Sequence, residues 1–327
     1  YLRDGKTINE FKLNYLYLTI KEYNNAVCSL LEINNNIFAC GFLYGEIDIY
    51  DTKDISILFS INEHKARINN LYLMKEKNTI LTSSFDYTMK KIKINGKAKN
   101  YIVEFIFDGY DCIIYKGIEL KNNHILSISF NGIVSIWNKI NSKTYVNKKR
   151  YDFDDEQLFD IIEVNDEEVA ISTNERLIFF NFENCNIDAE IKNFDFVKKN
   201  NLIKISKELL GLLLKHEIAL INVYQKYIIH KLNIPGNNKL DTICNLSDKT
   251  FLVVESNKND ENIRLIMKQY EYKNNKFNLL SEKDQNSKRL NENDYLRISS
   301  TIELSNGIVI FSTSGYVNQK LCGTISI

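Results

Sequence analysis

The residues that could carry out chemistry in this sequence are scattered rather than clustered. The four histidines, His64, His124, His216 and His230, lie far apart and form no H-E-x-x-H motif, the spacing that lets two histidines on one helix hold zinc. The six cysteines include no C-x-x-C pair, so neither a zinc site nor a short disulfide framework is predicted. We expect no metal and no cofactor.

Motifs for phosphate or acyl-transfer chemistry are also missing. The sequence contains neither G-x-G-x-x-G nor G-x-x-x-x-G-K-[ST], and its 12 glycines offer little material for phosphate-binding loops. No G-x-S-x-G elbow occurs. The acidic run at 152–156 lacks the glycine and the alternating spacing of a calcium loop, which favours a solvated connection. These observations argue against an enzyme.

Charge and hydropathy narrow the classes of partner. The chain has 42 basic and 42 acidic residues, so it lacks the positive excess of a protein that binds mainly to phosphates, and nucleic acid is not expected. No apolar run approaches the ~20 residues needed to span a bilayer. Widely spaced cysteines suit free thiols in a reducing compartment, so we expect an intracellular, cytoplasmic protein, with the nucleus as the alternative.

A repeat of short apolar strands is the strongest signal in the chain. One strand type ends in a polar residue and recurs with successive copies 41 to 45 residues apart, at 46–51, 89–93, 134–138, 177–181, 218–222 and 263–267. Each copy follows another short strand, at 37–40, 80–83, 125–128, 169–172, 212–214 and 251–254. This period is typical of β-propeller blades, and the β-branched and aromatic runs are too short for independent helices.

A seventh unit begins with the strands 307–311 and 323–327, and the chain stops before it is complete. The alternating segment 11–20 can supply its outer strand and so close the ring. We therefore predict an all-β, seven-bladed propeller spanning 1–327, with the polar segment 281–289 as a solvated insertion loop. The expected blades are 24–61, 62–107, 111–151, 157–194, 199–234, 240–283, and 296–327 with strand 11–22.

The second unit is similar to a WD repeat over its whole length. Residues 63–93 carry a His before the first strand and the run Thr82 to Lys93. In that family a loop His, a Ser or Thr, a turn Asp and a Trp form a hydrogen-bonded network. The resemblance assigns these roles to His64, Thr82 and Asp86, with Ile92 where the Trp would stand, and implies that the network stabilises the blade rather than catalyses a reaction.

The third unit shares other parts of the same signature. Ser127 and Asn131 occupy the corresponding polar positions, and Trp137 precedes an Asn in place of the family's Trp-Asp. The remaining units keep the strand rhythm without the signature. The strand pattern of the family therefore covers most of the chain, whereas its sequence motif covers only two or three blades. Membership of another propeller subfamily is the alternative.

One further position is predicted to face a partner. It directly precedes the turn residue equivalent to Asp86, and in WD-repeat proteins it lies on the face that bears the loops entering the innermost strands. Counting back equally from the repeat markers gives Leu43, Phe85, Phe130, Thr173 and Leu214, and Leu321 is taken as the equivalent in the final blade. This set is mostly apolar. Large apolar side chains on one rim suggest a docking patch; the alternative is that each packs against its neighbouring blade.

The resemblance implies a non-catalytic scaffold or adaptor that binds other proteins within a larger complex. A propeller domain of a larger protein whose activity lies elsewhere is one alternative, permitted by a chain that starts without Met and ends at Ile327. A propeller enzyme with a site on the ring axis is a second alternative.

Overall fold

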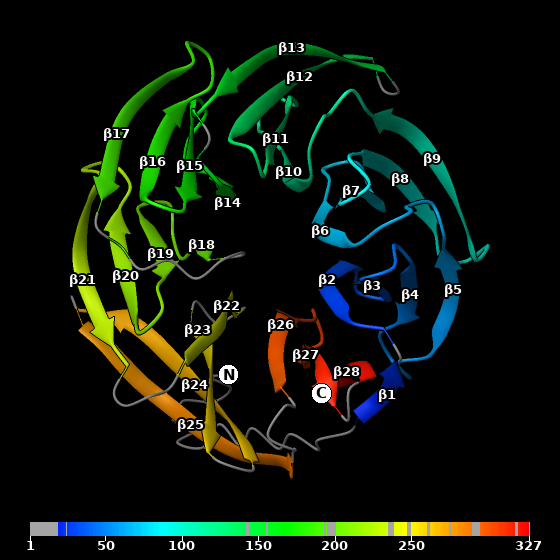
Figure 1. The fold of residues 1–327 in the computed structure, drawn as a ribbon, viewed down its shortest axis with the longest axis vertical. Helices are drawn as coiled ribbons and strands as arrows, with labels where there is room; N and C mark the ends of the chain where they lie inside the picture. The colour runs from blue at the N-terminus through cyan, green and yellow to red at the C-terminus, as the bar shows by residue number, and fades with distance from the viewer. Residues whose placement is uncertain are drawn as a thin grey trace, which may run out of the picture.

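The computed structural model is built from short antiparallel strands. It describes residues 19–326 except 24, 142–143, 155, 193, 195–200, 235–238, 247–249, 260–261, 275, 290–294 and 318–319. Within these residues 28 strands form seven four-stranded sheets. Figure 1 shows the sheets arranged around a ring, with strands β2, β6, β10, β14, β18, β22 and β26 nearest its centre. The predicted all-β propeller is confirmed.

Six sheets use four consecutive strands, which pair in chain order from the centre outward. The first three sheets contain β2 (Val27–Asn34), β3 (Ile37–Phe42), β4 (Ile47–Asp51), β5 (Ile57–Ile61); β6 (Ile68–Leu73), β7 (Thr79–Ser84), β8 (Met89–Asn95), β9 (Asn100–Phe107); and β10 (Ile114–Glu119), β11 (Ile125–Ser129), β12 (Ile133–Asn141), β13 (Thr144–Asp152). The next three contain β14 (Leu158–Glu163), β15 (Glu168–Thr173), β16 (Arg176–Asn181), β17 (Asn186–Lys192); β18 (Leu202–Lys204), β19 (Leu209–Leu213), β20 (Glu217–Asn222), β21 (Tyr227–Asn233); and β22 (Lys239–Asn245), β23 (Phe251–Asn259), β24 (Asn262–Lys273), β25 (Lys276–Arg289). We call them blades 1 to 6.

The seventh sheet, blade 7, joins the two ends of the chain. Strands β26 (Tyr295–Glu303), β27 (Val309–Val317) and β28 (Lys320–Ser326) are completed by β1 (Thr19–Tyr23), which pairs antiparallel with β28. In Figure 1 β1 and β28 lie side by side. The N-terminal strand was predicted at 11–20, of which 11–18 lie outside the described residues. Closure by a strand from the N-terminal side is confirmed.

The hydrophobic cores lie between adjacent blades. One of them combines apolar side chains of blade 1, such as Ile49, with those of blade 2, such as Ile92. Another combines Phe107 of blade 2 with Trp137 of blade 3. Each central strand therefore contributes apolar side chains to both of its faces, which is why the strands are apolar runs rather than strict alternations.

A β-bulge near the start of the innermost strand recurs in six of the seven described sheets, at Cys28, Asn69, Tyr115, Phe159, Asp241 and Ser299. The residue after the bulge connects neighbouring blades. Ser29 Oγ accepts a hydrogen bond from Leu71 N (3.2 Å), and Ser300 Oγ accepts one from Leu30 N (3.2 Å). These contacts link the innermost strands around the ring.

The predicted insertion loop at 281–289 is wrong. Strand β25 continues through Arg289 and pairs with β24 as far as Asn262. An outer strand is held by backbone hydrogen bonds to a single neighbour, so it does not need the apolar residues whose absence suggested a loop.

Candidate partner-binding face

Several of the predicted site residues, such as His64, Phe85 and Asp86, lie in two kinds of connection that meet on one face of the ring. One is the loop that enters an innermost strand, such as the segment 62–67 before β6. The other is the turn between the second and third strands of a blade, such as 85–88 between β7 and β8. Phe85 N donates to Arg67 O (2.9 Å), so in blade 2 the two connections are in direct contact.

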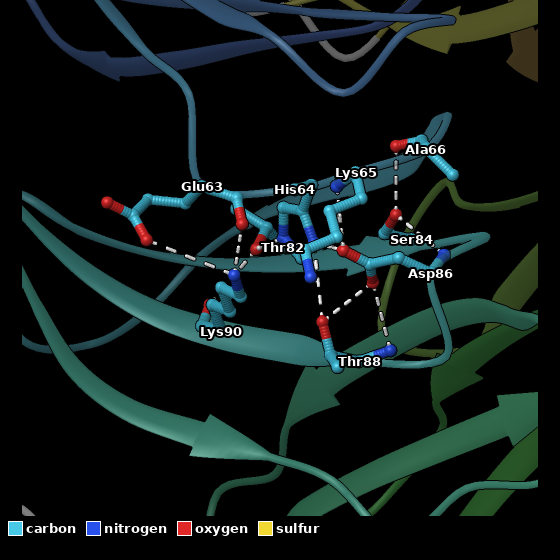
Figure 2. A network of polar contacts seen from close by, with 9 residues as sticks. All are labelled: Glu63, His64, Lys65, Ala66, Thr82, Ser84, Asp86, Thr88 and Lys90. Atoms are coloured by element: carbon cyan, nitrogen blue, oxygen red, sulfur yellow. Dashed lines mark hydrogen bonds and ion pairs between the residues drawn. The ribbon is translucent and has the colours of Figure 1, made fainter.

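In blade 2 the structure brings His64, Thr82 and Asp86 together (Figure 2). His64 Nδ1 lies 2.8 Å from Asp86 Oδ2, and His64 Nε2 lies 2.7 Å from Thr82 Oγ1. Lys65 N and Thr88 N also donate to the Asp86 carboxylate, both at 3.1 Å. The hydrogen bonds therefore join the entry loop of β6 to the β7–β8 turn, as the family resemblance implied.

Asp86 is the electrostatic centre of this network. Burial by itself would raise the pKa of the carboxyl, but the hydrogen bonds from His64, Thr88 and Lys65 outweigh burial and hold the pKa well below its usual range. Asp86 is therefore ionised at neutral pH and accepts a hydrogen bond from His64 Nδ1. On the other side of the ring, His64 Nε2 contacts the Thr82 hydroxyl, which also donates to Lys90 O (3.3 Å).

Thr82, His64 and Asp86 are connected in the same order as a hydroxyl nucleophile, its base and an orienting carboxylate. However, Thr82 is fully buried between strands, and the His64 side chain is also inaccessible. A substrate cannot reach the hydroxyl, so this arrangement stabilises the blade. Within the described residues, no group of three or more His, Cys, Asp or Glu could hold a metal ion.

Blade 3 replaces the histidine with a residue that sequence reasoning missed. The Tyr110 hydroxyl lies 2.6 Å from Ser127 Oγ and accepts a hydrogen bond from Trp137 Nε1 (2.7 Å). Tyr110 stands four residues before the first residue of β10, as His64 stands four before the first residue of β6. This shared offset is the sequence signal that identifies Tyr110.

Asn131 does not join that network. Its Oδ1 accepts a hydrogen bond from Ser129 Oγ (2.7 Å) and so acts only within its own turn. Trp137 is almost fully buried and meets Phe107 of blade 2 edge to face, with ring centroids 5.2 Å apart. The indole therefore fills the space between blades 2 and 3.

Three of the six predicted docking positions are equivalent in the structure. The backbone N–H groups of Leu43, Phe85 and Phe130 each donate to the carbonyl just before an innermost strand, all at 2.9 Å. Each of the three side chains is partly exposed. They thus occupy the same position in blades 1, 2 and 3.

The other three positions were assigned wrongly. In blade 4 the equivalent hydrogen bond comes from Asn174, and Thr173 is fully buried; in blade 5 it comes from Leu213, and Leu214 is also buried. Leu321 pairs with Tyr316 within the β27–β28 ladder instead of lying in a turn, and its side chain lies outside the described residues. Counting back from the third strand assumed turns of equal length, whereas the turn has four residues in blade 2 and two in blade 4. The turn of blade 5 has three residues, as in blade 3, so turn length does not explain the displacement of Leu214.

Leu43, Phe85 and Phe130 and their neighbours in these connections form a group that we call the aromatic rim, defined as Leu43, Tyr44, Arg67, Phe85, Tyr115 and Phe130. The Tyr115 ring lies 5.8 Å from the Phe130 ring, centroid to centroid. The Arg67 guanidinium lies over the Phe85 ring, 5.5 Å from its centroid. Tyr44 is 59% exposed, and the other five side chains are partly exposed.

Gly45 holds the blade 1 end of the rim against blade 2. Its φ of 96° lies in the left-handed region, and a Cβ at this position would stand 2.4 Å from His64 O. Only glycine allows the β3–β4 turn to approach the His64 loop this closely. The blade 1 end of the rim is therefore held closely against the entry loop of blade 2.

Comparison with solved structures supports the β-propeller fold. The chain is similar to the crystal structure of the WD40 β-propeller domain of Doa1, with a TM-score of 0.67 and 10% sequence identity, over 96% of this chain and 97% of that one. No family model matches the sequence, and no curated protein matches it significantly. The described residues include no helix long and apolar enough to cross a membrane.

Proposed function

We propose that this WD40-type propeller is a non-catalytic scaffold that binds partner proteins through the aromatic rim. The observation that carries the proposal is the rim itself: partly exposed large side chains from three neighbouring blades lie on one face, over turns whose backbones are hydrogen-bonded to the adjacent entry loops. Aromatic side chains and arginine are the residues that most often dominate protein interfaces.

A rigid surface suits this role because little conformational freedom is lost when a partner binds. Leu43, Phe85 and Phe130 extend from turns whose backbone N–H groups are already satisfied within the ring. A partner therefore meets a preformed surface. The described surface offers no comparable support for an enzyme, since the best-connected hydroxyl, that of Thr82, is buried.

The test compares two matched triple variants. Leu43→Ser, Phe85→Ser and Phe130→Ser together remove the apolar part of the rim. Leu73→Ser, Tyr224→Ser and Tyr227→Ser form the control, because these three side chains are 41%, 65% and 49% exposed near the connections of the opposite face.

Tagged wild type and both variants are expressed at equal levels in cells of the source organism, and copurified proteins are quantified by mass spectrometry. Partners are then purified and titrated against each form. We expect at least a tenfold loss of affinity for the rim variant and less than a twofold change for the control, as hot-spot residues dominate binding. Equal binding by a folded rim variant would contradict the proposal.

A further inference from the structure

Arg67 introduces a positive charge into an otherwise apolar rim. Its Nε is buried and donates no hydrogen bond within the described residues, and no carboxylate among them forms an ion pair with Arg67. A buried donor without an acceptor is costly. The rim therefore contains a guanidinium that the described part of the chain leaves uncompensated.

Two basic side chains of blade 3 near this face already form ion pairs. Lys116 Nζ lies 2.7 Å from Asp160 Oδ1, and Arg150 lies 3.6 Å from Asp111. Lys65, on the same loop as Arg67, is exposed to solvent. Arg67 is thus the one of these cations that is both set among aromatic rings and without an ion pair in the described residues.

Two aromatic side chains, Phe85 and Tyr115, surround Arg67. The Arg67 guanidinium lies over the Phe85 ring, 5.5 Å from its centroid, and its charge also acts on Tyr115. Burial raises the pKa of the Tyr115 hydroxyl, and the Arg67 charge partly offsets this rise. The guanidinium is therefore bordered by aromatic surface, where fewer water molecules compete for it.

We infer that the rim recognises a partner segment in which an Asp or Glu adjoins a bulky apolar residue, with Arg67 binding the carboxylate and Phe85 and Phe130 packing on the apolar side chain. This inference rests on the proposed function and names the chemistry of its partner. A single guanidinium matches the single charge of a carboxylate better than the double charge of a phosphate.

The chemistry of the guanidinium also explains why arginine suits this position. Its two terminal NH2 groups can donate two parallel hydrogen bonds to one carboxylate. Lysine would supply the charge without the paired geometry. We therefore expect Arg67→Lys to retain part of the affinity that Arg67→Gln loses.

The experiment uses a random twelve-residue peptide library displayed on phage, selected on the wild-type protein. Enriched peptides are synthesised and titrated by fluorescence anisotropy. We expect them to carry Asp or Glu next to Phe, Trp or Leu. Arg67→Gln should weaken binding about tenfold or more, Arg67→Lys by less, and the control Lys65→Gln by less than about twofold.

A second arm changes the peptide and leaves the protein intact, so that it holds even if an Arg67 variant folds poorly. Replacing the acidic residue by Asn or Gln should weaken binding to the wild type as much as Arg67→Gln does, with no further loss when both changes are combined. A phosphoserine at that position should bind no more tightly than the carboxylate.

The outcomes separate the two proposals. Peptides that need Leu43, Phe85 and Phe130 but bind Arg67→Gln at full strength, or that bind more tightly when phosphorylated, would overturn the inference and leave the proposed function standing. Failure to enrich any peptide that depends on the rim would count against both.

Discussion

Blades 2 and 3 both join the entry loop of the innermost strand to the sheet by hydrogen bonds, but they use different side chains. In blade 2 an ionised Asp86 and the imidazole of His64 join the entry loop to the sheet. In blade 3 the hydroxyl of Tyr110 joins the corresponding loop to Ser127 and Trp137 with neutral groups only. The position of the loop residue is shared, whereas its side chain is not. A polar link at this place can therefore be made with or without histidine.

The largest loss of stability is expected in blade 3, where the link is made by neutral groups. Trp137→Ala removes an almost fully buried indole between blades 2 and 3 together with its hydrogen bond to Tyr110. We expect the free energy of unfolding to fall by about 3–5 kcal/mol, measured by urea denaturation. A loss below about 1 kcal/mol would mean that the indole does not support this core.

A smaller loss of stability is expected in blade 2, where the link includes the ionised Asp86. Asp86→Ala leaves His64 Nδ1 and the Lys65 backbone amide without their acceptor, which should cost about 1–3 kcal/mol at neutral pH. Native spectra with unchanged stability would show that the network adds nothing to the blade.

The pH dependence of that loss sharpens the comparison. Because the pKa of Asp86 is lowered from its ordinary 3.8 in the folded protein, its stabilisation is complete well above that value and is lost as the pH falls through and below it. The difference between wild type and Asp86→Ala should therefore shrink in acid. The difference caused by Trp137→Ala should not, because burial raises the pKa of Tyr110 and keeps its hydroxyl neutral. Denaturation series at several pH values test both statements.

Tyr110→Phe should cost about 1 kcal/mol, since the ring stays in place and only the hydroxyl that links Ser127 and Trp137 is removed. Chemical denaturation measures the loss. Tyr110→His is the informative partner variant: a stability closer to the wild type than that of Tyr110→Phe would show that either polar group can make this link.

The smallest effect is expected for Asn131→Ala, which occupies the turn position of Asp86 but accepts only the Ser129 hydroxyl. We expect a change within about 0.5 kcal/mol. A loss as large as that of Asp86→Ala would show that the two turns are equivalent after all.

Most of the fold could be predicted from the sequence because the strand repeat keeps a nearly constant length. Each unit buries apolar residues on both sides of its central strands, and this requirement left a period of 41 to 45 residues in the sequence. The outer strand β25 was missed because an edge strand needs little apolar content.

The site was harder to predict because its geometry depends on turns and on backbone hydrogen bonds. His64 and Asp86 were found through a motif, while Tyr110 plays the corresponding part without matching it. Thr173 was misplaced because the turn of blade 4 is shorter than those of blades 2 and 3. The role of Arg67 follows only from its place over Phe85.

The pairing of β1 with β28 also determines the order in which the molecule can be completed during synthesis. Tyr23 pairs with Gly323, so the first strand emerges from the ribosome about 300 residues before its partner. At about 5–20 residues per second this delay lasts roughly 15–60 s. Throughout that time the nascent chain can assemble blades 1 to 6 in sequence while β1 still lacks its neighbour. The contacts between Leu30 and Ser300 and between β1 and β28 are among the last that translation makes possible.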